Sequence, residues 1–289
     1  MATKVAFLGL GVMGFPMAGH LKAKGYDVTV YNRSAEKARQ WVEKHGGQSA
    51  PTPAAAAKDC DFVMMCVGND KDLVEVATGK DGALSGMKKG AILVDHTTAS
   101  ADAARKIYAD AKSKGISFID APVSGGQAGA ENGKLTVMCG GDADAFEKAK
   151  PVMDSYGKAV TLMGASGAGQ LTKMVNQICI AGLVQALSEG IAFAEKAKLD
   201  PNLVLDVISK GAAQSWQMEN RGKTMVERKF NFGFAVDWMR KDLGICLDEA
   251  DRNGARLPVA ALVDQFYKDV QAMGGKRWDT SSLLARLEK

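Results

Sequence analysis

The chain has 289 residues, of which 46% are hydrophobic, so it is long enough for two domains with packed cores. Its 37 basic and 33 acidic residues are dispersed and leave a net charge of only +4, which argues against a nucleic-acid-binding protein. Five cysteines without a C-x-x-C pair indicate a reducing, cytoplasmic location. Because the three histidines are scattered, we predict no metal site. No apolar run reaches transmembrane length.

Residues 4–21 predict a dinucleotide-binding turn. A continuous apolar run ending at Leu8 is typical of a strand buried on both faces, and a helical pattern begins soon after it. Between them, Gly9 permits the tight turn, Gly11 lets a pyrophosphate approach the backbone, and Gly14 lets the helix pack on the strand. The residues expected to bind the cofactor in this turn are Gly9, Leu10, Gly11, Val12, Met13 and Gly14.

The end of the second predicted strand, residues 27–31, indicates which dinucleotide binds. A carboxylate at this place would bind the ribose 2′-OH of NAD, but the sequence has Asn32, Arg33 and Ser34 instead. The planar cation of Arg33 suits a 2′-phosphate, and the other two side chains can donate hydrogen bonds. The sequence therefore predicts NADP rather than NAD as the cofactor.

Strands and helices alternate up to residue 120, which predicts a parallel, doubly wound sheet. After the first two strands, we predict strands at 61–67, 91–95, 117–120, 134–139 and 159–162. Cys66 and Val67 end one strand and Thr98 follows another, at the carboxyl edge where ligands bind to such sheets. We expect all three to contact the cofactor, although Thr98 equally suits a helix cap. His96 is expected to be a packed polar side chain.

From residue 167 onwards the pattern is helical. No proline interrupts residues 167–198, so we predict one long helix at about 170–197. Further helices are predicted at 202–210, 215–226, 236–253, 259–273 and 281–288. The fold class is thus α/β, with an NADP-binding Rossmann domain at 1–164 and an all-helical substrate and oligomerisation domain at 165–289. We expect a homodimer or homotetramer that assembles through these C-terminal helices.

Two stretches could supply the chemistry that a hydride transfer needs, a proton donor and a substrate anchor. Ser124, Gly125 and Gly126 form a small-residue loop after a strand, which suits a carboxylate-binding nest or a plain glycine-rich turn. Lys173 lies in the first turns of the long helix, where the helix dipole disfavours its charged form, and Asn176 lies on the same face.

Four segments resemble the β-hydroxyacid dehydrogenase family: FLGLGVMGFPMA, DAPVSGG, GAGQLTKMVNQ and, in a later helix, MRKDL. They occur in that family's order and span essentially the whole chain. The resemblance implies a Rossmann domain followed by an all-α domain on which oligomers are built. It also implies the interconversion of 3-hydroxy or ω-hydroxy acids with semialdehydes or keto acids.

The resemblance assigns roles to individual residues. It implies that Lys173 is the catalytic lysine, that Asn176 orients the substrate and this lysine, and that Lys241 lies near both cofactor and substrate. The pair Lys241 and Asp242 is the weaker candidate, because adjacent lysine and aspartate residues are common on helix surfaces. The substrate site implied by the resemblance contains Ser124, Gly125, Gly126, Phe234, Lys241 and Asp242.

The substrate stays open at this point. Residues 32–34 resemble NADP-using glyoxylate/succinic semialdehyde reductases, whereas residues 173–177 resemble tartronate semialdehyde reductases. We therefore expect a small carboxylate-bearing substrate of one of these types or of the 3-hydroxyisobutyrate type. An imine reductase and a non-catalytic NADPH-binding protein are the alternatives. The intact loop at Ser124 argues against the first, and the presence of Lys173 argues against the second.

Overall fold

The computed structural model describes residues 2–288, which divide into two compact units. The first unit ends at Lys173 and the second begins at Met174. The boundary falls within helix α9 (Ala168–Lys196), whereas the sequence places it just before this helix, after residue 164.

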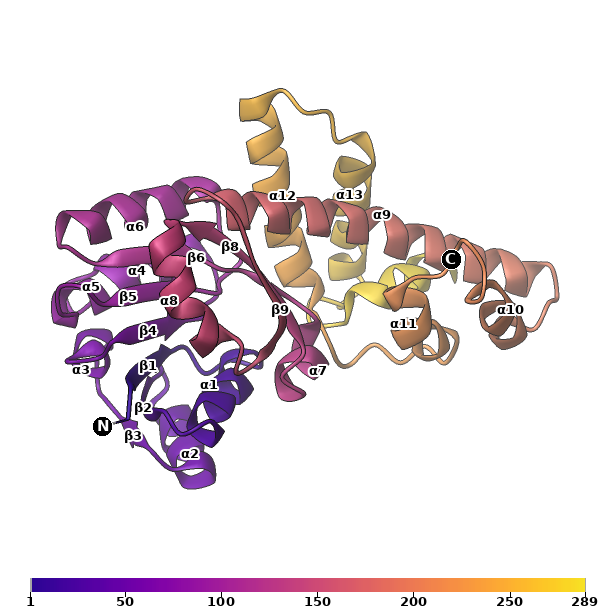
Figure 1. Ribbon diagram of the computed structural model, residues 1–289. Coiled ribbons are helices and arrows are strands. Elements are labelled where there is room, and N and C mark those ends of the chain that lie inside the picture. The colour runs from indigo at the N-terminus through magenta and orange to yellow at the C-terminus, as the bar shows by residue number, and fades with distance from the viewer. Residues whose placement is uncertain (1, 289) are drawn as a thin grey trace. The chain divides into compact units, whose positions relative to one another are not determined.

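The first unit is built on a nine-stranded sheet (Figure 1). Its order is β3-β2-β1-β4-β5-β6-β8-β7, with β9 paired to β8. The strands are β1 (Lys4–Leu8), β2 (Asp27–Tyr31), β3 (Gln48–Ser49), β4 (Phe62–Met65), β5 (Ile92–Asp95), β6 (Ser117–Asp120), β7 (Val123–Ser124), β8 (Leu135–Gly141) and β9 (Gly157–Gly164). The strands from β3 to β6 pair in parallel, which confirms the Rossmann-type sheet.

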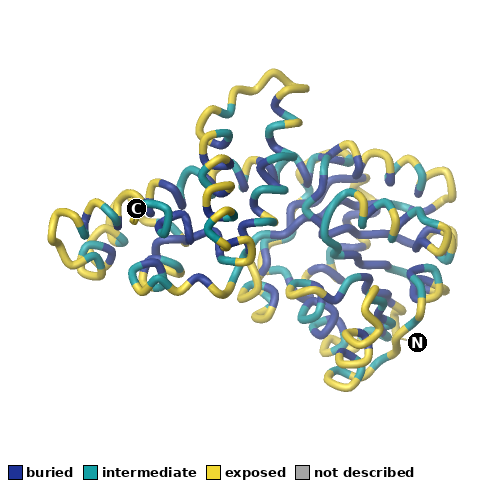
Figure 2. Tube along the Cα trace, turned by 180° about the vertical axis from the view of Figure 1, so that it is seen from behind, coloured by how far each residue is buried: buried dark blue, intermediate teal, exposed yellow. Residues whose placement is uncertain are grey.

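Helices cover both faces of this sheet. They are α1 (Gly14–Ala23), α2 (Ala35–His45), α3 (Pro53–Ala57), α4 (Asp70–Thr78), α5 (Ala83–Gly86), α6 (Ala101–Ser113), α7 (Gly126–Glu131) and α8 (Ala143–Met153). One core contains side chains of α1, α2 and α8, and a second contains side chains of α3, α4, α5 and α6. The strands between them form the dark-blue interior of this unit (Figure 2).

Strand β1 shows why the sequence forms a two-sided layer. Val5 and Phe7 belong to the first core, and Ala6 and Leu8 belong to the second, because side chains alternate along a strand. All four side chains are fully buried. This is the arrangement that the uninterrupted apolar run predicts.

The far edge of the sheet differs from the sequence-based expectation. Strand β8 pairs antiparallel with both β6 and β7, so the sheet is mixed rather than wholly parallel. The reason is the short connection after β6, which turns back through β7 and α7 before β8 begins. The short elements β3, β7, α5 and α7 are also absent from the prediction.

The second unit consists of helices that follow the boundary within α9. They are α10 (Pro201–Ile208), α11 (Trp216–Val226), α12 (Val236–Asn253), α13 (Pro258–Ala272) and the 3₁₀ segment η1 (Thr280–Glu288). Side chains of α9, α12 and α13 form one core, while α9, α10 and α11 contribute to another. The predicted helices agree with these bounds to within a few residues, except that the last one is 3₁₀.

Helix α9 is long and apolar enough to span a membrane by length and composition, with a mean hydropathy of 1.4 over an 18-residue window. This corrects the expectation that no such run exists. However, 44% of that window is buried within the protein, and core helices of soluble proteins meet the same criteria. A single helix of this kind is weak evidence for a membrane span.

Candidate active site

The glycine turn after β1 has the form that a bound pyrophosphate requires. Gly9 has a φ of +98°, and a Cβ added there would clash with the carbonyl oxygen of Cys66. A Cβ added at Gly14 would clash with the carbonyl oxygen of Gly9, so helix and turn pack with no spare room. At Gly11 an added Cβ would meet nothing within 4 Å. The backbone at Gly11 is therefore open to a ligand, at the start of α1, and a dinucleotide phosphate fits there.

The strand order places this turn where an α/β sheet binds ligands. Strand β1 lies between β2 and β4, so the connections after β1 and β4 diverge to opposite sides of the sheet. Such a switch point leaves a crevice at the carboxyl ends of the strands. The predicted contacts Cys66 and Val67 follow β4 directly at this edge, and both are partly buried.

At the end of β2, the three residues predicted to bind a 2′-phosphate differ in how they are used. The Oδ1 atom of Asn32 accepts a hydrogen bond from the backbone of Leu10 at 2.9 Å, and its Nδ2 donates to the carbonyl of Ser34. Ser34 precedes α2 without a side-chain capping bond. The side chain of Arg33 is 86% exposed and lies 3.4 Å from Asp72. Arg33 thus presents its guanidinium to solvent, while Asn32 supports the glycine turn.

Residues after β5 form a hydrogen-bonded link to β4. The hydroxyl of Thr97 accepts a bond from the backbone of Val67 at 3.0 Å, and the backbone of Thr97 donates to Oδ1 of Asp95. Asp95 is fully buried, and this burial raises the pKa of its carboxyl to about 7. Thr98 is not a helix cap, because Ser100 fills that position for α6 and accepts a bond from Ala103.

His96 is a packed side chain, as expected. It is 2% exposed, its Nδ1 is 2.7 Å from the carbonyl oxygen of Ala121, and its Nε2 is 2.8 Å from the hydroxyl of Tyr156. Desolvation lowers the pKa of this imidazole to about 4. With both nitrogens engaged inside the protein, His96 holds the chain that leads from β6 to Ser124.

The predicted carboxylate loop is a strand followed by a helix rather than an open loop. Ser124 ends β7, and α7 begins at Gly126. Gly125 between them has a φ of +132°, a conformation that other residues rarely adopt, so the sharp turn depends on glycine. Ser124 is partly buried and Gly126 is exposed. Backbone N–H groups at the start of α7 are oriented to interact with a negative charge.

Lys173 occupies a buried place in the second turn of α9, with 7% of its surface exposed. The start of this helix is attached to the sheet through Asp120, whose carboxylate accepts hydrogen bonds from the backbones of Gly167 and Gln170 at 2.7 and 3.0 Å. The lysine predicted to be catalytic is therefore fixed relative to the carboxyl end of β6. Asn176 lies one turn further along α9.

In the helical unit, three of the predicted residues are joined through a fourth. Asn176 donates a hydrogen bond to Oε1 of Gln177 at 2.8 Å, and Gln177 donates to Oδ2 of Asp242 at 2.6 Å. The ammonium of Lys241 lies 3.0 Å from the other oxygen of Asp242. The side chain of Asp242 is only 2% exposed and that of Lys241 is 21% exposed, so the pair is partly buried and is not the surface pair that its spacing suggests.

Two aromatic side chains near the start of α12 are Trp238, which lies beside this cluster, and Phe234. The ammonium of Lys241 lies 6.0 Å from the ring centre of Trp238, near the limit of a cation–π contact. Phe234 packs against the core formed by α9, α12 and α13, and its backbone donates a hydrogen bond to the buried carboxylate of Asp279. Asp279 also pairs with Arg221 at 3.2 Å. The segment before α12 is thus held in place around Phe234.

Sequence reasoning missed three residues that organise these sites: Asp120, Gln170 and Gln177. Each is buried and forms hydrogen bonds with residues far away in the sequence. Gln177 also bonds to its neighbour Asn176. The available signal was a polar residue inside an apolar pattern, at a strand end or on the buried face of α9. Within residues 2–288, no group of three or more His, Cys, Asp or Glu side chains is arranged to hold a metal ion.

Comparison with known proteins covers both units. Residues 4–164 match the family model described as the NAD binding domain of 6-phosphogluconate dehydrogenase. Residues 167–287 match the model described as NAD-binding of NADP-dependent 3-hydroxyisobutyrate dehydrogenase.

Individual relatives align along almost the entire chain. An uncharacterized oxidoreductase of Shewanella frigidimarina is 68% identical over 99% of this chain and 98% of its own length. The 2-hydroxy-3-oxopropionate reductase of Escherichia coli is 34% identical over 99% of this chain and 97% of its own length. The structure of 3-hydroxyisobutyrate dehydrogenase from Mycobacterium tuberculosis with L-serine superposes with a TM-score of 0.90 at 29% identity, covering 100% of both chains. By sequence and by fold, the chain belongs to the β-hydroxyacid dehydrogenase family of NAD(P)-dependent oxidoreductases.

Proposed function

We propose that this protein interconverts a small hydroxy acid and the corresponding semialdehyde or keto acid with NADP(H), and that Lys173 moves the proton. The observation that carries the proposal is the place of Lys173. Lys173 is 93% buried, in a helix start attached to the carboxyl end of β6. This supports the proposal, because such sheets bind ligands at the carboxyl ends of their strands. NADPH, when bound, supplies the hydride that reduces the carbonyl carbon.

Lys173 then acts on the carbonyl oxygen of the substrate. As that oxygen gains negative charge, the Nζ–H of Lys173 donates a proton to it, and the positive charge of the ammonium stabilises the developing alkoxide. In the oxidative direction the neutral amine takes the proton from the substrate hydroxyl. Asn176, one turn further along α9, orients the substrate and the lysine.

The substrate's carboxylate is assigned to Ser124, Gly125 and Gly126. The start of α7 supports this role, because its N–H groups and the Ser124 hydroxyl suit an anion. The family resemblance assigns Lys241 to the substrate site as well. Within the helical unit its ammonium lies 3.0 Å from Asp242, which also accepts a hydrogen bond from Gln177. The family resemblance also assigns Phe234 to the substrate pocket, and within the helical unit this side chain packs against the core of α9, α12 and α13.

NADP is the preferred cofactor in this proposal. The support is that no carboxylate follows β2 directly, whereas Arg33 extends into solvent at that place. Its contact with Asp72 is an exposed pair at 3.4 Å, which is too weak to withhold the guanidinium from a phosphate group.

A substrate panel tests the proposal. The kcat/KM values of glyoxylate, succinic semialdehyde, tartronate semialdehyde and methylmalonate semialdehyde are compared with NADPH and with NADH, and a cyclic imine serves as the non-carboxylate probe. We expect reduction of at least one carboxylate-bearing aldehyde or keto acid, at a higher kcat/KM with NADPH. Turnover of the imine alone, or of nothing in the panel, would contradict the proposed substrate class.

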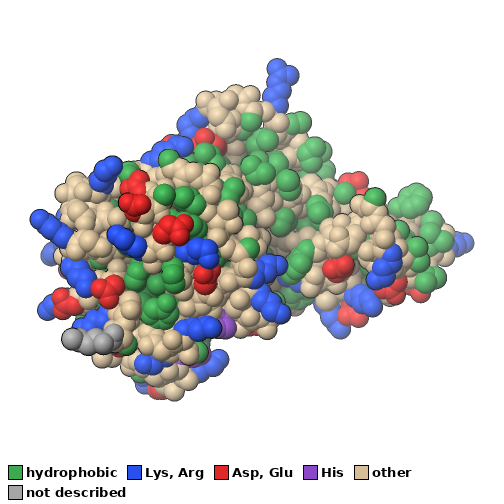
Figure 3. Space-filling view, viewed as in Figure 1, with side chains coloured by type: hydrophobic (Ala, Val, Ile, Leu, Met, Phe, Trp, Pro, Cys, Tyr) green, Lys and Arg blue, Asp and Glu red, His purple; other side chains and the backbone are tan. Residues whose placement is uncertain are grey.

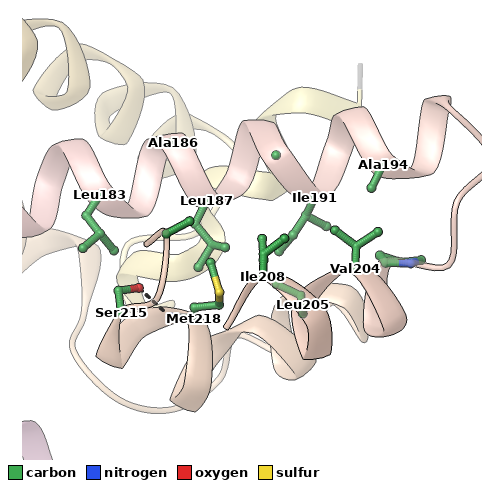
Figure 4. Close-up of a pocket in the computed structure, with 13 residues that line it drawn as sticks. Leu183, Ala186, Leu187, Ile191, Ala194, Val204, Leu205, Ile208, Ser215 and Met218 are labelled. Carbon is green, nitrogen blue, oxygen red and sulfur yellow. Dashed lines mark hydrogen bonds between the residues drawn. The ribbon is translucent and has the colours of Figure 1, made fainter. Parts of the chain in front are cut away.

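We also propose that the chain assembles as a homodimer or homotetramer through its C-terminal helices. Phe193 near the end of α9 and Leu203 and Val207 in α10 are 73%, 62% and 63% exposed. Figure 3 shows hydrophobic side chains gathered over this end of the helical unit. Other side chains of α9 and α10, together with α11, line an apolar pocket of about 320 Å³ (Figure 4). None of the predicted catalytic or cofactor residues lines this pocket. A second copy of the chain would bury this surface.

We propose a cytoplasmic location as well. The support is that no disulfide joins the cysteines within residues 2–288, and that Cys60, Cys139 and Cys246 are buried. Fractionation of cells that express the protein, with the activity assayed in each fraction, tests this location.

A further inference from the structure

The first turn of α9 is attached to two neighbouring strand ends by two fully buried side chains, Asp120 and Gln170. Asp120, at the end of β6, accepts hydrogen bonds from the backbones of Gly167 and Gln170. The side chain of Gln170 reaches the segment after β5, where its Nε2 donates to the carbonyl of Thr97 at 2.8 Å and its Oε1 accepts from the backbone of Ala99 at 3.0 Å.

The two partners of Gln170 flank Thr98, the residue expected beside the nicotinamide. Gln170 therefore fixes the backbone on both sides of Thr98. It also lies three residues before Lys173, on the same face of α9 one turn earlier. A single amide thus sets the distance between the segment expected to bind the cofactor and the helix turn that carries the lysine.

We propose that Gln170 is a positioning residue for proton transfer, which holds the ammonium of Lys173 in register with the Thr97–Ala99 segment. This inference rests on the proposed function, because it assigns Gln170 a role through Lys173. The network continues beyond Gln170, since Thr97 also binds the backbone of Val67 at the end of β4. Hydrogen bonds thus connect the segments after β4 and β5 with the helix start that precedes Lys173.

The surroundings leave little freedom for this helix start to shift. A Cβ added at Gly169 would lie 2.8 Å from a carboxylate oxygen of Asp120, and one added at Gly140 would lie equally close. Only glycine admits such close packing between β8, Asp120 and α9. Burial raises the pKa of Asp120, while the hydrogen bonds from the helix backbone oppose this shift.

A glutamine is the side chain that this place requires. It supplies one donor and one acceptor on the same planar group, as Thr97 and Ala99 demand. Methionine at position 170 would keep the volume but leave the buried carbonyl and N–H without partners. Glutamate would keep the acceptor for Ala99 and lose the donor for Thr97.

A double-mutant cycle tests the inference. Gln170→Met and Lys173→Ala are made singly and together, and single-turnover reduction rates and NADPH dissociation constants are measured for each. We expect Gln170→Met to lower the rate about tenfold or more while Lys173 is present, because small misplacements of a catalytic group have large effects. In the Lys173→Ala background it should lower the rate by less than about twofold, since the group that it positions is gone. NADPH affinity should change by less than about threefold, a contribution below that of one lost hydrogen bond.

Two controls keep the outcome decisive. Gln185→Met removes another buried glutamine of α9, four turns further along, and should leave the rate unchanged. Gln170→Glu serves if Gln170→Met fails to fold, with the same dependence on Lys173 expected. An equal loss in both Lys173 backgrounds, or no loss with Lys173 present, would overturn the inference. A near-normal rate for Lys173→Ala alone would instead refute the proposed proton donor.

Discussion

The imidazole of His96 and the phenol of Tyr156 form a buried hydrogen bond of 2.8 Å, with their rings at 89°. The other ring nitrogen of His96 faces the carbonyl oxygen of Ala121, which can only accept. Nδ1 of His96 therefore carries a proton. Because burial lowers the pKa of the ring to about 4, His96 is neutral near pH 7, and its Nε2 then accepts from the Tyr156 hydroxyl. His96 thus ties the segment after β5 to Ala121, which follows β6, and to Tyr156, which precedes β9.

The pair predicts a pH-dependent contribution to stability. Burial lowers the pKa of His96 to about 4 in the folded state, below the 6.5 of an exposed histidine. Between these values the unfolded chain binds a proton that the folded chain does not, so stability falls as the pH drops from 6.5 to 4. The free-energy advantage of the wild type over His96→Phe should shrink by about 3 kcal/mol across this range.

Urea unfolding of both proteins at several pH values measures this difference. The comparison with His96→Phe is needed because Asp95, with its raised pKa near 7, acts in the opposite direction over the same range in both proteins. A difference in unfolding free energy that does not change between pH 4 and 6.5 would show that His96 is not held neutral by burial.

Replacement of Lys173 by alanine should lower kcat by about a hundredfold or more, in line with the loss of a general acid. NADPH binding should remain nearly intact, because Lys173 is not among the residues expected to bind the cofactor. Lys196→Ala, at the exposed end of the same helix, is the matched control and should retain full activity. Steady-state kinetics and NADPH fluorescence titration check these expectations, and a kcat close to that of the wild type would exclude Lys173 as the proton donor.

Arg33→Ala should raise KM for NADPH about ten- to hundredfold, the effect of losing charge-assisted hydrogen bonds to a phosphate. KM for NADH should hardly change, because NADH lacks the 2′-phosphate. Arg39→Ala, which removes an exposed arginine of α2 paired with Glu36, should affect neither cofactor. Equal changes of both KM values would mean that Arg33 does not select NADP.

The extent to which sequence reveals this structure depends on the range of the interactions. The apolar run before Gly9 and the helical periodicity after residue 167 are local patterns, and the corresponding elements agree with the structure. The antiparallel pairing of β8 with β6 depends on how a short connection turns back, which no local pattern records.

The candidate site divides in the same way. Lys173 stands out because a lysine at the start of an apolar helix is unusual. Gln170 and Gln177 do not, because their partners lie 71 to 73 and 65 residues away in the sequence, respectively. The burial of Asp242 could not be predicted either, because its i,i+1 spacing with Lys241 is that of an ordinary surface pair.

Two glycine variants should separate cofactor binding from folding. Gly11→Ala adds a methyl group into open space, so stability should change by less than about 0.5 kcal/mol, as for substitutions that disturb no contacts. NADPH should bind about tenfold more weakly or worse, because the methyl group occupies the approach to the backbone amides. Gly14→Ala should instead destabilise the fold by about 1–3 kcal/mol through the clash with Gly9. Thermal unfolding and NADPH titration measure both effects. Unchanged NADPH affinity in Gly11→Ala would show that the pyrophosphate does not bind at this turn.

Charged residues on the exposed apolar surface of α10 should break the proposed assembly. In the variant Leu203→Glu/Val207→Glu, two side chains that are 62% and 63% exposed acquire charge, which a subunit interface cannot bury without a partner. Sedimentation velocity should show a dimer or tetramer for the wild type and a monomer for this variant, with the NADPH affinity of the Rossmann unit retained. Met163→Glu, at an exposed apolar residue of β9, is the control and should sediment as the wild type does. A monomeric wild type would refute the assembly itself, whereas an oligomeric double variant would place the interface on another surface of the chain.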